Sequence, residues 1–555
     1  MRPLIECVPN FSEGNDLTII KAITDEIQSV EGVKLLNVDP GKATNRTVVT
    51  FVGEPDSAIE AAFRAIKKAA ELIDMSKHKG EHPRMGATDV CPLIPVSGIT
   101  MKETVEYAKK LGKRVGEELG IPVYLYEYAA TSPHRKNLSV LREGEYEGIT
   151  EKIKKPEWKP DFGPAKFNVK SGSTVIGARD FLVAYNVNLN TTSVRKANSV
   201  AFDIRENGRV KKNAKGETVK DKKGNVMRIP GACKAVKAIG WFIKEYGIAQ
   251  VSINLTNLNV TPVHVAFEET CRSAEKRGLR VTGSELVGLI PLKSLLDAGK
   301  YFLRKQHHSA GVSEEMLIKI AVKSLGLDEL APFNPEKKII EYMLKDDNSA
   351  PLVKMNLRAF ANETASESPA PGGGSVAAYV GALGVSLGTM VANLSAGKKG
   401  WENRTEEFSA WAEKGQMLKD KLLKLVDEDT KAFNAIMAAY QLPKNSQERK
   451  DAVQNATRHA IEIPFEVMKT SLESMGLLKA MAEKGNPNSI SDVGVGALCA
   501  RCAVLGAWLN VKINAGNLES KDFVKKVLKS GKILVGKAED VEKEIFNAVE
   551  KKIQS

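Results

Sequence analysis

The sequence predicts two kinds of fold in one chain: an α/β half made of two subdomains with sheets packed by helices, followed by an all-α helical-bundle half. β-rich runs alternate with amphipathic helices in the first third, and a second set of strands and helices follows residue 177. After residue 336 strand patterns give way to long helical periodicities. At about 150 residues per domain, the length allows roughly three or four folding units.

The α/β half alternates strands with helices, which is typical of helices packed on a sheet. In the first subdomain, strand patterns fall at 4–8, 33–38, 47–52 and 123–126, and helical patterns at 56–73 and 102–119. In the second, strands are expected at 177–189 and 249–255, and helices at 264–277, 292–305 and 313–325. We predict domains at 1–181 and 182–333 and a linker at 334–352, whose polar centre is 346–350.

The remaining residues, 353–555, are predicted to form a helical bundle. Its expected helices are 376–395, 404–438, 446–472, 474–484, 492–513 and 520–553. One of them lies in an uncharged run, 368–397, long enough to suggest a membrane span. Small residues recur along one face of this run and allow close helix packing (Ala377, Gly381, Gly384, Gly388 and Ala392). We therefore predict a buried bundle or subunit-interface helix, and no membrane span in this chain.

The net charge of +13 suggests an anionic partner, which could be nucleic acid or a polycarboxylate or phosphate ligand. Much of the excess lies in a polar insertion, 205–228, which has no aromatic residue for base stacking. We interpret the insertion as a solvated hairpin and predict no nucleic-acid partner. Six scattered cysteines form no disulfide pattern, and the Cys499-x-x-Cys502 pair is interpreted as packed thiols. With no signal peptide before the first strand pattern, a reducing, cytoplasmic location is expected.

The segment 80–96 contains the strongest candidate for chemistry, His82. The proline after His82 disfavours a helix there, and Gly86, Pro92 and Pro95 interrupt the rest of the segment. We therefore expect neither a plain helix nor a plain strand. An imidazole on a rigid loop suits proton transfer near neutral pH, although a lone histidine more often caps a turn.

A metal site is the alternative for this segment. His78 lies four residues before His82, with Glu81 between them, so zinc binding by a His-x-x-x-His pair has to be weighed. That pairing requires a continuous helix and a third ligand, and neither is evident. We predict no metal.

Several long motifs resemble a known family. In the α/β half, Glu6-Cys-Val-Pro-Asn-Phe-Ser-Glu-Gly, Thr44-Asn-Arg-Thr and Gly80-Glu-His-Pro-Arg-Met-Gly-Ala-Thr-Asp-Val-Cys-Pro are similar to formiminotransferases. In the helical half, Ala370-Pro-Gly-Gly-Gly-Ser and Val426-Asp-Glu-Asp-Thr-Lys-Ala-Phe resemble formimidoyltetrahydrofolate cyclodeaminase. Together they cover nearly the whole chain in the order of the bifunctional formimidoyltransferase-cyclodeaminase family. The 205–228 insertion is longer and more basic than that family leads us to expect.

The resemblance implies two linked reactions in histidine degradation and folate one-carbon metabolism. N5 of tetrahydrofolate would take the formimino group from N-formimino-L-glutamate and release glutamate. N10 would then close onto the same carbon with loss of ammonia, which gives 5,10-methenyltetrahydrofolate. The expected co-substrate is polyglutamylated tetrahydrofolate, and a homo-oligomer is expected.

For the transfer, the resemblance places the catalytic histidine at His82. Asp39 and Asp89 could orient its imidazole or hold the formimino cation, although Asp39 precedes a Pro-Gly pair and could equally form a turn. Arg46 and Arg84 could bind substrate carboxylates bidentately, or form ion pairs.

The segment 163–172 is the folate-binding loop by its position in the family. Its candidate residues are Gly163, Pro164, Lys166, Lys170 and Gly172. Glycine and proline would let the backbone approach a flat pterin, and the lysines could reach glutamate carboxylates. The alternative is a simple interdomain connection. Asn10, which follows a strand, could line the same cleft or cap a turn.

In the helical half, the resemblance selects Asp429 as catalytic, with Asp427 in support. At positions i and i+2 of a helix the two carboxylates point to different faces, and one could face the interior, where burial raises its pKa. A run of acids is also typical of a solvated face. Gly373, Gly374 and Ser375 are expected in a loop whose amides could receive a carboxylate or a pterin carbonyl, although Ser375 could be only an N-cap.

Two other functions stay open at this point. The chain could be a transferase whose helical half is a binding or oligomerisation module. It could instead be a basic nucleic-acid-binding protein, which strong salt dependence would reveal.

Overall fold

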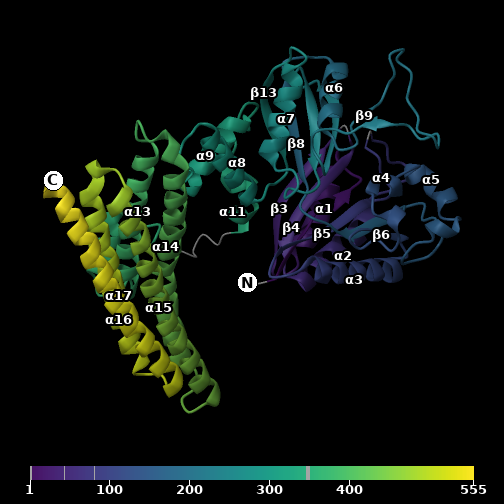
Figure 1. Ribbon diagram of the computed structural model, residues 1–555. Helices are drawn as coiled ribbons and strands as arrows, with labels where there is room; N and C mark the ends of the chain where they lie inside the picture. The colour runs from purple at the N-terminus through teal and green to yellow at the C-terminus, as the bar shows by residue number, and fades with distance from the viewer. Residues whose placement is uncertain (1–2, 43, 81, 345–350, 555) are drawn as a thin grey trace. The chain divides into compact units, whose positions relative to one another are not determined.

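The computed structural model describes residues 3–42, 44–80, 82–344 and 351–554, and divides the chain into two compact units (Figure 1). The first comprises Met1–Ser294 and Leu325–Leu344, and the second comprises Leu295–Ser324 and Lys345–Ser555. The predicted order, an α/β half followed by an all-α half, is confirmed. The domain limits stay a prediction, and both Glu81 and the linker centre 346–350 lie outside the described residues.

A mixed seven-stranded sheet forms the first part of unit 1. Its spatial order is β1-β4-β2-β5-β7-β6 with β3 paired to β4, and only β7 pairs in parallel, with β5 and β6. The strands are β1 Leu4–Cys7, β2 Asn10–Phe11, β3 Val33–Gly41, β4 Arg46–Gly53, β5 Thr88–Ser97, β6 Val123–Glu127 and β7 Thr174–Ala178. The helices are α1 Leu17–Gln28, α2 Pro55–Leu72, α3 Met101–Leu119, α4 Leu138–Leu141 and α5 Glu145–Lys152. All four strands and both helices that the sequence predicts here are confirmed.

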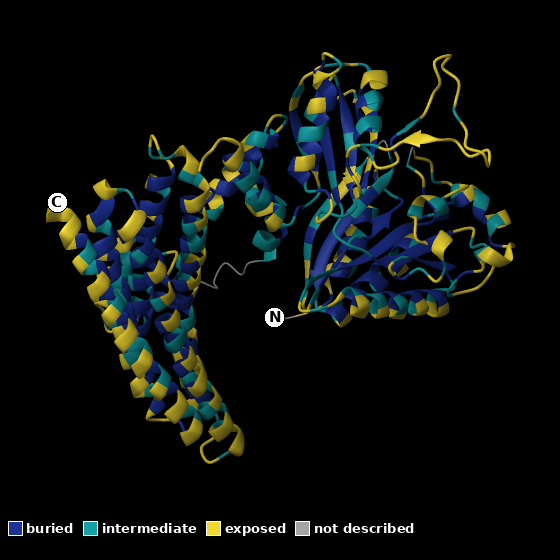
Figure 2. Cartoon of the chain, viewed as in Figure 1, coloured by how far each residue is buried: buried dark blue, intermediate teal, exposed yellow. Residues whose placement is uncertain are grey.

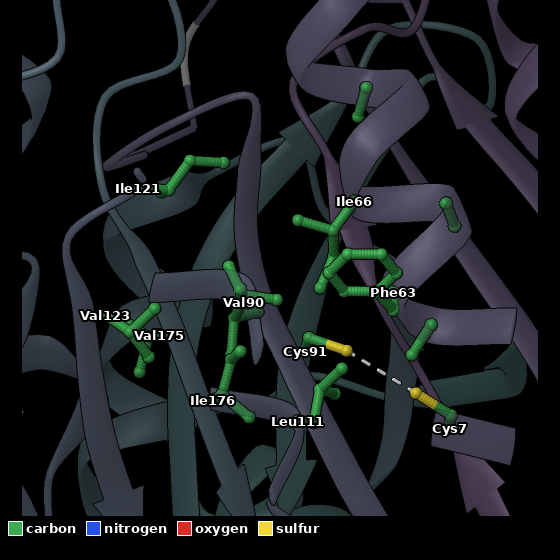
Figure 3. Packing of buried hydrophobic residues seen from close by; sticks show 14 of the residues in the cluster. Cys7, Phe63, Ile66, Val90, Cys91, Leu111, Ile121, Val123, Val175 and Ile176 are labelled. Carbon is green, nitrogen blue, oxygen red and sulfur yellow. Dashed lines mark hydrogen bonds between the residues drawn. The ribbon is translucent and has the colours of Figure 1, made fainter. Parts of the chain in front are cut away.

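Side-chain alternation along the strands separates a core face from an open face. Ile5 and Cys7 of β1 are fully buried in the core, where the Cys7 and Cys91 sulfur atoms lie 3.5 Å apart (Figure 3). Residues of α2 and α3, including Phe63 and Leu111, pack on this side. The side chains that alternate with Ile5 and Cys7 face the other way and contribute to a cavity.

The expectation that 80–96 contains no plain strand is wrong for its second half. Residues 88–97 form β5, a strand that pairs with β1, β2 and β7 and runs through both prolines. A proline cannot donate to the ladder, but its carbonyl still accepts, and Pro92 accepts from the amide of Val8 at 3.2 Å. Pro95 lies opposite Ile5, where the β1 ladder is irregular.

A four-stranded antiparallel sheet, in the order β11-β12-β8-β13, forms the second part of unit 1. Its strands are β8 Val183–Leu189, β11 Val236–Ile243, β12 Ile248–Leu255 and β13 Val281–Val287. The helices α6 Val194–Ile204 and α7 Val263–Glu275 pack with it, and α10 Pro335–Lys338 and α11 Ile340–Leu344 follow. One face is apolar, with Tyr185 and Val251 fully buried, and the other carries polar residues such as Asn186 and Asn254.

The insertion forms the exposed hairpin that the sequence predicts (Figure 2). Its root is the pair β9 Arg209–Val210 and β10 Arg228–Ile229, and two turns follow one another with a period of eight residues. Asn213 accepts from the amides of residues 215 and 217, and Asp221 accepts in the same way from residues 223 and 225. The backbones of Lys211, Val219 and Met227 are joined in a ring, each donating at 2.9 Å to another member.

Unit 2 is a bundle of long helices whose buried residues lie between the helices (Figure 2). The helices are α12 Leu357–Thr364, α13 Gly373–Ala396, α14 Thr405–Gln441, α15 Gln447–Lys484, α16 Ile490–Ala515 and α17 Lys521–Gln554. The two helices predicted at 446–472 and 474–484 are one, because buried residues such as Ser471, Ser474 and Met475 continue the same stripe through the expected break.

The small residues of α13 are buried, as predicted. Side chains added at Gly381, Gly384 and Gly388 would collide with or crowd residues of α15 and α16, so these helices approach each other closely. Two helices, Gly373–Ala396 and Pro487–Ala515, satisfy the length and composition of a membrane span, but their most apolar windows are 61% and 50% buried. The second lies outside the run that the sequence singles out. The thiols of Cys499 and Cys502 are not a packed pair as expected, since Cys502 is exposed.

The turn between α8 Leu292–Lys305 and α9 Glu314–Leu325 belongs to unit 2 by its contacts. The amide of Ala310 donates to Ser409 Oγ at 2.9 Å, and the carbonyl of Gly311 accepts from Asn393 and Gln416 at 2.8 and 3.0 Å. Lys300 forms an ion pair with Glu413 on α14 at 2.9 Å.

Candidate active sites

A cavity of about 630 Å³ lies on the open face of the seven-stranded sheet in unit 1, and residues of the four-stranded sheet also line it. Strand alternation explains much of its lining, since the residues that face it alternate along β4 (Arg46, Val48 and Thr50) and β5 (Val90 and Pro92). Its polar lining includes Glu6, Asn10, Asp39, Arg46, His82, Tyr126, Arg142, Arg179 and Lys237. Four sequence candidates therefore meet here: Asn10, Asp39, Arg46 and His82.

His82 is held between two partners. Its Nδ1 lies 2.7 Å from the carbonyl oxygen of Pro83, so Nδ1 carries the proton and donates it. Its Nε2 contacts Nη1 of Arg46, which can only donate. Burial lowers the pKa of His82 to about 4, and the positive charges of Arg46 and Arg142 contribute. The imidazole is therefore neutral at pH 7, and the lone pair of Nε2 faces a guanidinium.

Arg142 is a functional candidate that sequence reasoning missed. It lines the cavity from the segment after α4, and it forms an ion pair with Asp89, whose side chain is fully buried. Asp89 also accepts from the amide of Met85 at 3.0 Å. The buried carboxylate thus fixes Arg142. Burial lowers the pKa of Arg46 to about 10, and the positive charge of Arg142 contributes to this shift. Asp89 itself does not orient His82 directly.

Arg84 lies outside the cavity lining. Its guanidinium is buried and bonded to Glu145 at 2.8 Å and to Glu147 at 2.6 Å. Its Nε donates to His78, whose other ring nitrogen lies 2.9 Å from the carbonyl oxygen of Asn45. Both nitrogens of His78 are thus engaged away from His82. Among the described residues, no group of three or more His, Cys, Asp or Glu side chains could hold a metal ion.

The loop 163–172 packs against residues 85–87, which follow His82 in the chain. All five of its candidate residues are described, and none of them lines the cavity. Gly163 packs on the backbone of Ile121, and Gly172, at a φ of 69°, pairs with Gly86. Pro164 and Lys166 are exposed, while Lys170 donates to the carbonyl of Glu71 at 2.7 Å.

In unit 2 the structure brings Asp429 to the first turn of α13. Ser375 Oγ lies 3.2 Å from the Asp429 carboxylate and donates at 2.8 Å to the carbonyl of Val426. Burial raises the pKa of Asp429, and the hydroxyl and amide of Ser375 oppose that effect. A side chain at Gly374 would lie 2.2 Å from an Asp429 oxygen, so only glycine permits this approach.

Two expectations for this region are corrected. Gly373, Gly374 and Ser375 are the first residues of α13 rather than a loop, and the N-cap is Gly372 rather than Ser375. Asp427 is buried and accepts from the amides of residues 352 and 353 at 2.9 and 3.3 Å, so it has different partners from Asp429. Gly373 faces Asn510 of α16, a residue without a sequence signal.

Comparisons with known proteins cover both units. Family models match residues 4–179 (formiminotransferase domain, N-terminal subdomain), 184–345 (formiminotransferase domain) and 356–532 (formiminotransferase-cyclodeaminase). The formimidoyltransferase-cyclodeaminase of Mus musculus is 44% identical over 531 residues, which cover 95% of each chain.

Proteins that correspond to single halves also match. A glutamate formimidoyltransferase of Thermoplasma acidophilum is 45% identical and covers 54% of this chain and 92% of its own. A methenyltetrahydrofolate cyclohydrolase of Methylorubrum extorquens is 36% identical and covers 36% of this chain and 97% of its own.

Fold, sites and matched regions define a fusion of two enzyme halves, an α/β transferase half and a helical half with a partly buried carboxylate, Asp429. The chain belongs to the formimidoyltransferase-cyclodeaminase family.

Proposed function

We propose that this chain transfers the formimino group from N-formimino-L-glutamate to N5 of tetrahydrofolate and then cyclises the product to 5,10-methenyltetrahydrofolate with loss of ammonia. The observation that carries the proposal is the cavity that neutral His82 shares with Arg46, which contacts it, and with Arg142, whose charge acts on it, within a chain whose two halves both match this family.

Arg46 and Arg142 bind substrate carboxylate groups in this proposal. A guanidinium can bind a carboxylate through two parallel hydrogen bonds. The ion pair with Asp89 orients Arg142 and does not involve Arg46. When a substrate carboxylate binds the guanidinium of Arg46, that guanidinium no longer donates to Nε2 of His82. The carboxylate also neutralises part of the positive charge near His82. Both changes raise the basicity of His82 at the moment when it must accept the proton from N5.

His82 then returns a proton to the departing glutamate nitrogen as general acid. Such proton transfer contributes about 10²–10⁴-fold to the rate. Asp39 lies on the cavity wall beside Arg46 and is assigned to the formimino cation, and Asn10 lines the same wall. We assign Arg84 and the loop 163–172 to supporting the His82 segment.

For cyclisation, Asp429 exchanges protons with the formimino nitrogen that leaves as ammonia. Burial favours its protonated form, which is the form that can donate. Ser375 positions the carboxylate, and the N-terminus of α13 around Gly373 and Gly374 provides amide donors for the substrate. Asp427 holds residues 352 and 353 on the bundle.

The helical half is also proposed to form a homo-oligomer. α16 carries exposed apolar side chains at near-heptad spacing (Val495, Leu498, Leu505, Leu509 and Ile513), and Leu383, Met390 and Leu394 are exposed on the adjacent α13. Leu509→Lys should lower the mass measured by light scattering, and an unchanged mass would argue against this face. With six free cysteines, we propose a cytoplasmic location, and we propose polyglutamylated folate as the preferred co-substrate.

One incubation tests both activities. Purified protein is mixed with formiminoglutamate and tetrahydrofolate, and glutamate, ammonia and methenyltetrahydrofolate are quantified together. Equal amounts of all three are expected. Glutamate without ammonia would remove the cyclodeaminase assignment, and absence of glutamate would remove the transferase assignment.

A further inference from the structure

A buried carboxylate in the cavity, Glu6, has no role in the chemistry assigned above. The neighbours of Glu6, Ile5 and Cys7, point into the core, whereas Glu6 points the other way and lines the cavity. Glu6 is nevertheless only 5% exposed. In the strand register it lies opposite Val52 and Ile94, both buried and apolar.

The surroundings of Glu6 do not satisfy its carboxylate. Among the described residues, no hydrogen bond or ion pair to it is found, and the charges that act on it are those of Arg179 and Glu341. Phe181, Leu289 and Ile340 also line the cavity, and they pack in one apolar cluster with Val52, the residue opposite Glu6. An ionised carboxylate without partners in apolar surroundings is costly, and burial raises its pKa to about 7. Such a group is suited to a ligand that brings two N–H donors.

We propose that Glu6 and Arg179 form the subsite for the pyrimidine edge of the pterin ring. The proposal rests on the proposed function for the identity of the co-substrate. That edge presents the N3–H and 2-amino donors side by side and the 4-oxo acceptor next to them. The two oxygens of Glu6 accept the paired donors, and the guanidinium of Arg179, which also lines the cavity, donates to the 4-oxo group.

The spacing along the sheet agrees with this arrangement. Asn10 lies four positions after Glu6, which in extended backbone corresponds to about 13 Å. Asn10 pairs with Val48, which also pairs with Asp39, so these three residues form one row across the sheet. This row contains Asp39, the residue assigned to the formimino cation. A flat bicyclic ring bound at Glu6 would therefore extend towards His82, and the apolar residues beside Glu6 would contact its face.

The competing ligand for Glu6 is the amidinium of formiminoglutamate, which also presents two N–H donors. Its placement at Glu6 would put the reacting carbon about 13 Å from the Asn10 row, which lies beside the His82 end of the cavity. The pterin edge is favoured because only its far side has to reach that end.

The test measures binding as well as turnover. The probes are tetrahydrofolate, 6-methyltetrahydropterin, which lacks the glutamate tail, and a tetrahydrofolate analogue without the 2-amino group. The variants are Glu6→Gln, Glu6→Asp and, as the matched control, Glu341→Gln. Glu341 is the neighbouring acid, bonded at 2.7 Å to the amide of Leu292, and it does not line the cavity. Thermal unfolding verifies that each variant folds.

Loss of a charged hydrogen-bond pair predicts that Glu6→Gln binds tetrahydrofolate and 6-methyltetrahydropterin about 10–100-fold more weakly. The KM for formiminoglutamate should stay unchanged, and Glu6→Asp should lie between wild type and Glu6→Gln. The wild type should prefer the 2-amino compound by a similar factor, and Glu6→Gln should not distinguish the two. Glu341→Gln removes a repelling charge from Glu6 and should therefore not weaken pterin binding.

Two outcomes would overturn the proposal: unchanged pterin binding in Glu6→Gln, or a rise confined to the KM for formiminoglutamate. If the wild type binds 6-methyltetrahydropterin through Glu6 but releases no glutamate, the subsite stands and the proposed transferase function fails. The two failures are therefore distinguishable.

Discussion

His82 shows how one residue's surroundings select its chemical role. A histidine with an ordinary pKa would be partly protonated near neutral pH and would lose basic character as the pH falls through 6.5. Burial and two neighbouring arginines keep His82 neutral to about pH 4. The same arginines that attract an anionic substrate therefore hold the base in its unprotonated form.

The first prediction concerns pH. A lowered histidine pKa means that the active, neutral form persists as the pH falls. At saturating tetrahydrofolate, kcat/KM for formiminoglutamate should thus decline only as the pH approaches about 4. In Arg46→Gln the imidazole loses a repelling charge while its burial remains, and the decline should begin at a higher pH. Initial rates of glutamate release between pH 4.5 and 8 measure both profiles. Identical profiles would refute the electrostatic account.

The second prediction concerns Arg142. Asp89→Asn removes the negative charge that fixes Arg142, and the KM for formiminoglutamate should rise about 10-fold or more with little change in tetrahydrofolate affinity. Arg142→Lys should give a similar rise, because a lysine cannot reproduce the paired contact. Asp25→Asn, at an exposed ion pair with Lys21, serves as a neutral control. An unchanged KM in Asp89→Asn would remove the assignment.

Sequence reasoning finds His82 because a proline and glycines surround it, but it cannot find Arg142. Arg142 meets Asp89 across 53 residues of chain, and nothing in its local sequence marks the contact. For Arg84 the sequence leaves an ion pair and a substrate contact equally open. Arg84 forms an ion pair because the fold brings Glu145 and Glu147 next to it, and the local sequence does not show that proximity.

At the scale of elements, the approach of α13 to α14 creates the carboxylate site of unit 2. The third prediction is that Gly374→Ala displaces Asp429, because the added methyl group would lie 2.2 Å from its oxygen. Ammonia release should fall about 100-fold or more, while glutamate release stays unchanged. Gly372→Ala is the control, since its nearest neighbour would be 3.8 Å away. Equal ammonia release in both variants would contradict the assigned geometry.

Strands and helices are predicted well where one periodicity dominates, as in α2, α3 and α8. The exceptions have physical reasons. β5 tolerates two prolines because the neighbouring ladder uses the carbonyl of Pro92 and is irregular opposite Pro95. The break expected near residue 473 is absent because small buried residues there still pack, although they weaken the apolar signal.

At the scale of the molecule, the α8–α9 turn links the two halves of the chain in an unexpected way. It precedes the linker in sequence, yet its contacts are with α13 and α14. Hydropathy patterns do not encode this choice of partner, because α8 and α9 are amphipathic helices that could pack on either half. The predicted domain limits follow the linker and therefore cannot anticipate it.

The fourth prediction follows from that turn. When residues 1–344 and 351–555 are produced as separate chains in one cell, they should copurify, because the turn carries its contacts with α13 and α14 on the first chain. Gly311→Asp should abolish copurification, since even a Cβ at this position would lie 2.2 Å from the Ala412 side chain. Gly278→Asn, at a left-handed glycine in open space, is the control. Copurification of the Gly311→Asp pair would refute the role of the turn.

The exposed hairpin has a modular length. Its two turns are equivalent under a shift of eight residues, and the ring of backbone bonds joins residues 211, 219 and 227. Removal of residues 213–220 would bring Lys212 next to Asp221, keep the second turn complete, and leave the β9–β10 root unchanged. The insertion can therefore lengthen or shorten by whole repeats, so duplication or loss of a single octapeptide would change its charge and reach while both catalytic halves keep their structure.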